Sequence, residues 1–407
     1  MNIKSLSRIG HGANDVYWFI LPTILPLILR EHGFSYAAAG GFITMFLCII
    51  ALLSFLIGTL ADRVSRSFLL IAGFFIASAS LLIAGSASSF GAFLVFVFLA
   101  AIGVSSYHPV IYAVIDEGIA THRGTMYAHF ELFGAAGVVA LLVFNGLLVE
   151  RVGWKNIVLV ACAPGLIAAS LFILNRSKFK KRPNAILGDA DSKESFTQSQ
   201  EIDGDSLTHE YLDKAYARNL FVVFLVSIAL RTLTATAILN FMPTFLVLGA
   251  GLDVSLGAFA AGLVFVGAIA VSTFVGGIAD RWGAHKVLLT ASLSAGVFLF
   301  LSTYATSAWS LPISLIVLGA SISGALPAQN LILSTLSRKG RKGTTFGTLM
   351  GVMTIANSLG PLALGVLADR IGLHLTYRLA ALPVLISCAL VAFVSRKMRD
   401  TSLRPTS

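Results

Sequence analysis

The sequence predicts an all-α membrane protein in which 12 transmembrane helices form two pseudo-symmetric six-helix bundles, with both termini cytoplasmic. Three observations support this prediction. The composition is too apolar for a water-soluble chain, the polar residues are concentrated between long apolar segments, and one short motif occurs once in each half.

The composition places the chain in a membrane. Of its 407 residues, 57% are hydrophobic and only 12% are charged, with a mean hydropathy of +0.87. Soluble domains carry about 25% charged residues, so this chain cannot cover a water-facing surface. Its apolar segments are too long for barrel strands, and the first one lacks the pattern of a cleaved signal peptide. The three cysteines lie inside apolar segments and are expected to be small core residues rather than disulfide partners: Cys48, Cys162 and Cys388.

Twelve apolar segments are long enough for the roughly 20 residues that a helix needs to cross the hydrocarbon core. They are predicted at 10–30, 36–60, 68–86, 90–115, 124–149, 155–175, 218–248, 254–279, 286–304, 309–335, 344–368 and 376–395. The one long polar stretch has the composition of a disordered linker. We therefore expect an N-terminal bundle over 1–175, a cytoplasmic linker over 176–217 and a C-terminal bundle over 218–407.

Lysine and arginine set the orientation, because cytoplasmic loops carry an excess of these residues. With the N-terminus in the cytoplasm, 23 of the 29 fall on the cytoplasmic side and 5 on the opposite side, and Arg231 is left inside a span. The same asymmetry accounts for the net charge of +10. We therefore expect the lipid bilayer, and no nucleic acid, as a partner.

A repeated motif indicates that the two halves are duplicated. Its first copy runs from Gly58 to Arg66 and its second from Gly276 to Lys286, 218 residues further on, each in a loop between two predicted spans. Matches in the first, fourth and fifth spans of each half have offsets of 218 to 221. Near-constant offsets indicate parallel repeats related by an axis along the membrane normal.

On these residues the chain resembles the major facilitator superfamily over its whole length. In that family the loop after the second helix reads G-x-x-x-D-[RK]-x-G-[RK]-[RK]. The matching positions are Gly58, Asp62, Arg63 and Arg66 in the first copy and Gly276, Asp280, Arg281, Gly283 and Lys286 in the second. The resemblance implies a transporter that works by alternating access, with these loops as a cytoplasmic gate. The alternative is a charge cluster that only sets topology.

A narrower resemblance is to the fosmidomycin-resistance-like branch of bacterial efflux proteins. It rests on the first-span string from His11 to Tyr17 and on the fourth-span string from Ser105 to Pro109. It implies a proton-coupled exporter of small organic molecules or drugs in the inner membrane of a bacterium, acting as a monomer without a cofactor. The chain departs from the antiporter pattern in one respect, because its Gly360-Pro361 pair lies in the eleventh span and not in the fifth.

Three ionisable residues of the N-terminal half are candidates for proton coupling: Asp15, His108 and Glu131. Each lies about 10–12 Å from the cytoplasmic end of its helix at 1.5 Å per residue. Charged groups inside a span are costly and usually face a cavity, and coupled groups exchange protons as a set. The alternative is a structural hydrogen-bond network. His11 shares a helix face with Asp15 at i,i+4 spacing, but we expect it, like His129, to be solvated near the interface.

Arg231 lies about 20 Å into the seventh span, near the midplane, and its guanidinium stays protonated. It is expected either to bind an anionic substrate group or to pair with Asp15 or Glu131 across the two halves. Other candidate substrate contacts are Asn14, Tyr17, Tyr107, Asn240, Gln329, Asn330 and Asn357.

Three functions remain open at this stage. The first is a proton-coupled exporter, the second an importer or facilitator of a small organic anion bound by Arg231, and the third a non-transporting receptor on the same scaffold. No phosphate-binding Gly-Lys-Ser/Thr loop and no His-Glu-x-x-His or cysteine pair occurs, so neither ATP-driven, enzymatic nor metal chemistry is expected.

Overall fold

The computed structural model describes residues 1–61, 63–118, 123–179, 214–305, 307–336 and 342–402. In this part of the chain, 12 helical segments are long and apolar enough to cross a bilayer. Each one overlaps a predicted segment, which confirms the all-α membrane fold. The linker predicted at 176–217 lies mostly outside the described residues.

The helices of the N-terminal half are α1 Ile3–His32, α2 Tyr36–Leu60, α3 Arg66–Gly85, α4 Phe90–Val104, α5 Tyr107–Gly118, α6 Arg123–Val152, α7 Trp154–Val160 and α8 Ala163–Leu174, followed by the short 3-10 helix η1 Arg176–Phe179. Those of the C-terminal half are α9 Lys214–Thr244, the π-helical turn η3 Phe245–Gly249, α10 Val254–Ser272, α11 Val275–Trp282, α12 Ala284–Ser302, α13 Ser310–Leu336, α14 Lys342–Ile371 and α15 Leu373–Ser402.

Short polar side chains begin several of these helices, because they satisfy backbone N–H groups that the first turn leaves unpaired. Asn2 accepts from Ser5 N at the start of α1 (2.8 Å), and Asp253 accepts from Leu256 N at the start of α10 (2.7 Å). Gly33 ends α1 in the left-handed conformation (φ 64°), which glycine adopts without strain. These local signals fix where the chain turns at the membrane surface.

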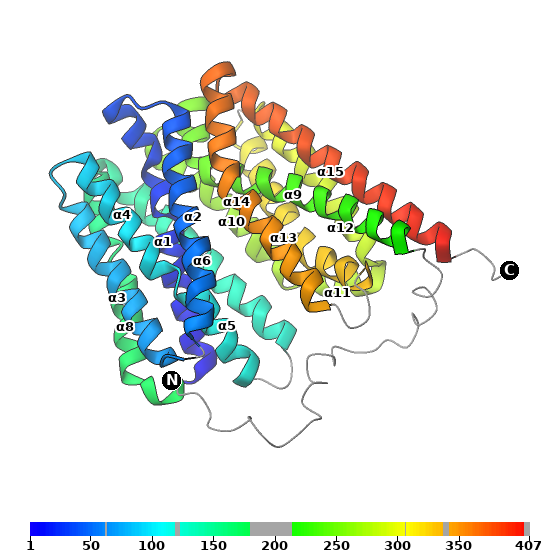
Figure 1. Ribbon diagram of the computed structural model, residues 1–407. Coiled ribbons are helices and arrows are strands. Elements are labelled where there is room, and N and C mark those ends of the chain that lie inside the picture. The colour runs from blue at the N-terminus through cyan, green and yellow to red at the C-terminus, as the bar shows by residue number, and fades with distance from the viewer. Residues whose placement is uncertain (62, 119–122, 180–213, 306, 337–341, 403–407) are drawn as a thin grey trace.

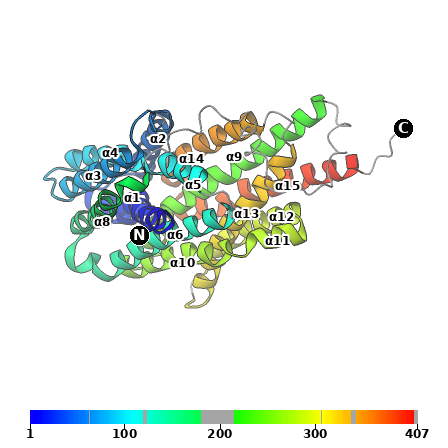
Figure 2. The same cartoon turned by 90° about the horizontal axis from the view of Figure 1, so that it is seen from below.

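The two halves lie side by side and meet along two pairs of helices. Viewed from the end that carries the N-terminus, α2 borders α14 and α6 borders α10 (Figure 2). Helix α1 packs on α6 within its own half and also contacts α9 of the other half. Toward the end with the N-terminus the helices of the two halves diverge (Figure 1).

Hydrogen bonds join the halves at the opposite end, which we call the closed end. The Asp369 carboxylate of α14 accepts from Tyr36 N (2.7 Å) and Ala37 N (2.9 Å) at the start of α2. Leu362 N donates to Thr44 Oγ1 (3.2 Å) in the same helix pair. A carboxylate at a helix N-terminus also interacts favourably with the helix dipole. These three hydrogen bonds hold α2 against α14 in this conformation.

Candidate functional site

Two glycines bring α1 and α6 into close contact in the N-terminal half. A Cβ atom on Gly12 would lie 3.0 Å from Phe133 O, and one on Gly137 would collide with the Gly12 carbonyl. Any side chain at either position would force the helices apart, as in small-residue packing between membrane helices. Side chains next to this crossing therefore reach the other helix.

The His11 side chain reaches from α1 to α6 across this close crossing. Its Nδ1 lies 2.7 Å from the carbonyl oxygen of Phe130 in α6, and its ring stacks on the Phe130 ring with centroids 3.8 Å apart. The side chain is only 1% exposed. The expectation that His11 is solvated near the interface was wrong, because the close helix crossing buries its ring between α1 and α6.

A break in the fourth span positions His108. Helix α4 ends at Val104, and α5 begins at Tyr107 after Ser105 and Ser106. Pro109, in the first turn of α5, has no N–H to continue the helical hydrogen bonds from α4. The freed backbone is partly satisfied by serine, since Ser54 Oγ donates to Ser105 O (3.1 Å). The chain restarts so that the His108 ring faces α1.

Three ligand-type atoms meet at this point: His11 Nε2, His108 Nε2 and Asp15 Oδ1. The two imidazole nitrogens are 3.1 Å apart, and His11 Nε2 lies 3.4 Å from the carboxylate oxygen. One ligand atom from each residue lies within 4.8 Å of the other two. The Asp15 side chain is 24% exposed, so the cluster is open to a water-sized particle.

The neighbours of the two imidazoles determine where their protons sit. A carbonyl oxygen only accepts, so His11 Nδ1 carries a proton and donates to Phe130 O. The Asn14 amide has partners at both ends when it donates to Val104 O (3.3 Å) and accepts from Trp18 Nε1 (3.2 Å). Its oxygen then takes the position 3.4 Å from His108 Nδ1, which donates to it.

Both imidazoles therefore point an Nε2 lone pair, and Asp15 a carboxylate oxygen, at one small volume. Lone pairs 3.1 Å apart repel unless a cation lies between them. With these tautomers the arrangement can hold a shared proton or a metal ion between the two nitrogens.

Glu131 and Gly134 of α6 border this cluster. The Tyr112 hydroxyl donates to Glu131 Oε1 (3.3 Å), and the Glu131 side chain is exposed. A Cβ on Gly134 would lie 2.7 Å from His11 Cε1 and would also collide with Asp15 Oδ2. The missing side chain at Gly134 thus makes room for Asp15 and His11, a role that the sequence alone did not identify.

Two predicted substrate contacts of this half are packed in its interior. The Tyr17 hydroxyl is hydrogen-bonded to Ser78 Oγ (2.8 Å) and donates to Cys162 O (3.1 Å), and the side chain is 1% exposed. The Tyr107 hydroxyl donates to Ser7 O, and the Tyr107 ring lies nearly parallel to the His11 ring, with centroids 6.2 Å apart. Both tyrosines tie α1 to neighbouring helices of the same half.

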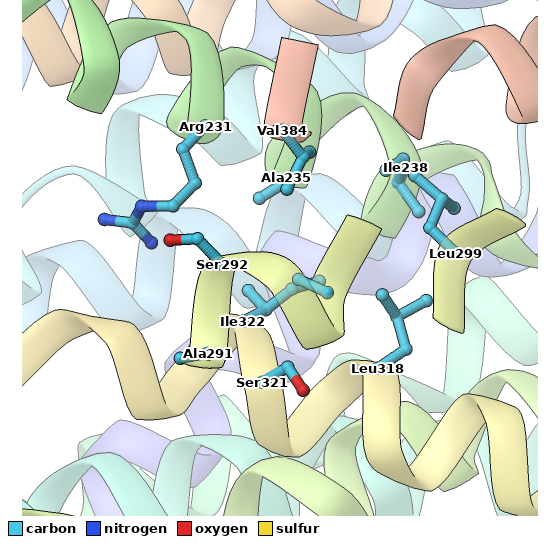
Figure 3. Close-up of a pocket in the computed structure, with 11 residues that line it drawn as sticks. Arg231, Ala235, Ile238, Ala291, Ser292, Leu299, Leu318, Ser321, Ile322 and Val384 are labelled. Atoms are coloured by element: carbon cyan, nitrogen blue, oxygen red, sulfur yellow. The ribbon is translucent and has the colours of Figure 1, made fainter. Parts of the chain in front are cut away.

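Arg231 lies inside the C-terminal half, with its side chain 6% exposed. It donates to Gln329 Oε1 of α13, and no ion pair with a carboxylate is found for it among the described residues. Pairing with Asp15 or Glu131 across the halves therefore does not occur in this conformation. Arg231 also lines a cavity of about 10 Å³ and points toward the Ser292 hydroxyl (Figure 3), which leaves room for about one water molecule.

The other polar candidates of this half lie on three helices. Thr236 of α9 donates to Asn357 Oδ1 of α14, and Asn240 donates to Thr236 O (2.8 Å). Asn330 is exposed beside the buried Gln329. These residues form polar links between α9 and α14 but no cluster of ionisable groups.

The predicted gate lies at the end where the halves diverge. Arg63, Arg281 and Lys286 are exposed, and a Cβ on Gly58 would meet Pro109 at 3.8 Å. Arg66 is buried at the start of α3. Asp62, the burial of Gly276 and the side chain of Asp280 lie outside the described part of the structure.

Comparison with known proteins places this arrangement in a family. A family model described as Major Facilitator Superfamily matches residues 9–271 and 224–407. The multidrug resistance protein MdtG of Escherichia fergusonii is 33% identical over 135 residues, which is 33% of each chain. The uncharacterized MFS-type transporter YuxJ of Bacillus subtilis is 30% identical over 132 residues, 32% of this chain and 33% of that one. The matched part thus spans about a third of the length of these curated relatives.

Solved transporter structures share the fold over nearly the whole chain. A bacterial homolog of the human lysosomal transporter Spinster, in an inward-facing and occupied conformation, has a TM-score of 0.74 at 17% identity, covering 99% of this chain and 98% of that one. The nucleoside transporter NupG has a TM-score of 0.74 at 15% identity, covering 97% of this chain and 100% of that one.

Proposed function

Because the chain belongs to the major facilitator superfamily and is a multi-pass membrane transporter of that family, we propose that it exports small organic molecules in exchange for protons. In this proposal the protein is a monomer without a cofactor, in the inner membrane of a bacterium. The three parts are 1–175, 176–217 and 218–407, with both termini in the cytoplasm.

The observation that carries the proposal is the convergence of His11, His108 and Asp15. Their atoms favour one shared proton, and Asp15 is accessible enough to exchange it. In this proposal Glu131 of α6, which accepts a hydrogen bond from Tyr112, is the next group to accept the proton. In a coupled set the loss of a proton changes the charge of the whole cluster, and that change can be linked to substrate binding.

Alternating access requires contacts that exist in only one of two states. The bonds from Asp369 to α2 close one end in this conformation. We propose that the gate loops around Asp62 and Asp280 replace them in the other conformation, closing the end that carries the termini. In this proposal the substrate then contacts polar side chains of the C-terminal half, among them Asn330 and Asn357.

Export, rather than import, is favoured by the efflux relative alone. MdtG is named as a multidrug resistance protein, and about a third of its length matches this chain. The direction of transport and the substrate are therefore proposals to be tested in intact cells and in vesicles.

The test uses the full chain in proteoliposomes with a pH-sensitive dye inside and a panel of cationic and neutral drugs outside. Wild-type protein should move protons when a substrate gradient is imposed, and Asp15→Asn should bind substrate without moving protons. His32→Gln, which alters an exposed histidine paired with Glu31, is the control and should behave as wild type. Proton movement by Asp15→Asn at the wild-type rate would refute the proposed coupling.

A second function, uptake or facilitated passage of a small organic anion, is favoured by one observation. Arg231 is a buried cation with a neutral partner, Gln329, and such a charge is costly in a membrane unless an anion offsets it. The cavity beside it is too small for an organic anion in this conformation. Growth on a sole organic acid that depends on Arg231 would favour this alternative, whereas drug resistance on overproduction favours export.

A receptor function would show a different dependence on the chain. A receptor tolerates loss of the Asp15 and Glu131 carboxylates but fails when the 176–217 segment is deleted, and a transporter shows the opposite pattern.

A further inference from the structure

We propose that His11, Asp15 and His108 form a binding site for one transition-metal cation of the Zn²⁺ type, in the N-terminal half between α1 and α5. No metal motif is visible in the sequence, because the ligands come from two helices that are far apart along the chain. The structure brings one ligand atom from each of the three within 4.8 Å of the others.

The distances match a coordination shell that needs little rearrangement. Zn²⁺ binds imidazole nitrogen at about 2.0–2.1 Å and carboxylate oxygen at about 2.0–2.2 Å, with tetrahedral geometry, so neighbouring ligand atoms are roughly 3.3–3.5 Å apart. His11 Nε2 lies 3.1 Å from His108 Nε2 and 3.4 Å from Asp15 Oδ1. Two edges of the tetrahedron are thus already formed, and the third, between His108 and Asp15, is at most 4.8 Å long.

The surroundings of both histidines are those of metal ligands. Metal-binding imidazoles usually donate their second N–H to a carbonyl or carboxylate, which fixes the ring and the tautomer. His11 does so with Phe130 O (2.7 Å), and His108 does so with the Asn14 amide oxygen in the orientation that satisfies this amide. Trp18 and Val104 hold that amide in turn. Both Nε2 lone pairs are therefore aimed before any ion binds.

The ligand types select the ion. Two imidazole nitrogens suit Zn²⁺, Cu²⁺ or Ni²⁺, whereas Mg²⁺ and Ca²⁺ prefer all-oxygen sites. Two histidines and one carboxylate leave a fourth position open, as in zinc sites that exchange a ligand. The Tyr112 ring lies beside the His108 ring, with centroids 5.8 Å apart, and its hydroxyl donates to Glu131, so water or the Glu131 carboxylate is expected at the open position.

Metal and proton occupy the same atoms, so the ion is expected to block the proton exchange proposed above. Metal binding itself does not depend on that function and is measured without transport. Zinc binding by a wild-type protein that moves no protons would overturn only the proposed function, and proton movement by a wild-type protein that binds no zinc would overturn only this inference.

The experiment is a titration of purified full-length protein, in detergent and freed of metal, with ZnCl₂ against a fluorescent zinc chelator. Wild type should bind one Zn²⁺ per chain, and X-ray absorption at the zinc edge should give two imidazoles with N/O ligands near 2.0 Å. His108→Gln and Asp15→Asn should each weaken binding by at least about tenfold. His32→Gln, which removes the exposed His32–Glu31 pair as an adventitious site, should leave binding unchanged.

A readout of folding separates a lost ligand from a misfolded protein. Each variant should elute as a single species and melt at the wild-type temperature without metal, while only wild type and His32→Gln should melt higher with Zn²⁺, because a ligand of the native state stabilises it. Equal zinc affinity in wild type and His108→Gln, no binding by wild type, or loss of binding in His32→Gln would each overturn the proposal.

Discussion

Replacement of Asp369 by alanine should open the closed end of the molecule. The carboxylate accepts hydrogen bonds from Tyr36 N (2.7 Å) and Ala37 N (2.9 Å), so it links the two halves at the N-terminus of α2. In Asp369→Ala both amides lose this partner and are left to water. The bonds belong to the present conformation, so their loss should lower its population and leave the other conformation unaffected.

The size of the effect follows from the geometry and the exposure. Hydrogen bonds to charged groups contribute roughly 1.5–3 kcal/mol, but exposed charge interactions are screened and contribute less than about 1 kcal/mol. Asp369 is exposed, so about 1 kcal/mol for each of the two bonds is a reasonable value. A total of about 2 kcal/mol corresponds to a roughly 30-fold change in the ratio of the two conformations, since 1.4 kcal/mol is a factor of ten.

The repeat provides a matched control. Glu150 occupies the position in α6 that corresponds to Asp369 in α14, at an offset of 219 residues. The start of α10 is already capped by its own Asp253 side chain (2.7 Å to Leu256 N), and no hydrogen bond to Glu150 is found in the described part of the chain. Glu150→Ala should therefore change the ratio by less than about twofold, within the range of ordinary surface substitutions.

Pulsed electron paramagnetic resonance measures the ratio directly. Spin labels at Ser88→Cys and Ala308→Cys report on exposed loops of the two halves at the closed end, after the native cysteines have been replaced: Cys48, Cys162 and Cys388. Asp369→Ala should shift weight from short to long label distances. An unchanged distance distribution, or an equal shift in Glu150→Ala, would refute the reasoning.

Three further predictions each concern one residue. Gly134→Ala should abolish transport, because its Cβ would displace His11 and Asp15, whereas Gly41→Ala, with no atom within 4 Å, should retain it in the same vesicle assay; activity in Gly134→Ala would contradict this. Tyr17→Phe should lower unfolding stability by about 1 kcal/mol and leave transport affinity unchanged, so a weaker substrate affinity would restore its predicted substrate role. Arg231→Lys should keep protein levels but weaken transport of anionic substrates by about tenfold or more, since lysine lacks the planar fork; equal transport would confine Arg231 to a structural role.

Hydrophobic patterning predicted the fold because each membrane helix is determined locally. A span needs about 20 apolar residues whatever its neighbours are, and all twelve predicted segments overlap a helix that is long and apolar enough to cross a bilayer. The glycine-rich crossing of α1 and α6 was also predictable, since small residues mark close packing. The break between α10 and α11 was not predicted, because the apolar segment continues through it. The break between α4 and α5 lies directly before Pro109, a residue that marks a kink in a membrane helix.

The site was only partly predictable, since it depends on the rotation of helices about their own axes. The i,i+4 spacing of His11 and Asp15 indicates one face, and the structure pairs them. Depth along the helix nevertheless misplaced His11 in solvent, because depth does not reveal the Phe130 ring that covers it. The proximity of His108 to Asp15 was expected from their similar depth in the first and fourth spans, but the contact of His108 with His11 was not, because it depends on the break before α5.

The partner of Arg231 illustrates a second limit. A buried charge predicts a partner of opposite sign, and the carboxylates of the other half were the available ones in the sequence. In the structure Arg231 of α9 instead donates to the neutral Gln329 of α13, in the same half. Charge complementarity across two bundles that move relative to each other cannot be inferred from a single sequence.

The two halves divide the chemistry unequally, although they share a fold. The offset of 221 residues between the first spans of the halves aligns His11 with Thr232 and Asp15 with Thr236. Thr236 donates to Asn357 of its own half, so among the described residues the C-terminal half has no counterpart of the cluster of His11, Asp15 and His108. A change of charge in that cluster can therefore affect the closed end only through helices of the N-terminal half that also contact the C-terminal half. Helix α1 contacts α9, and α6 contacts α10, which makes the α1–α6 crossing the element whose rearrangement can relay a change of charge to the interface between the halves.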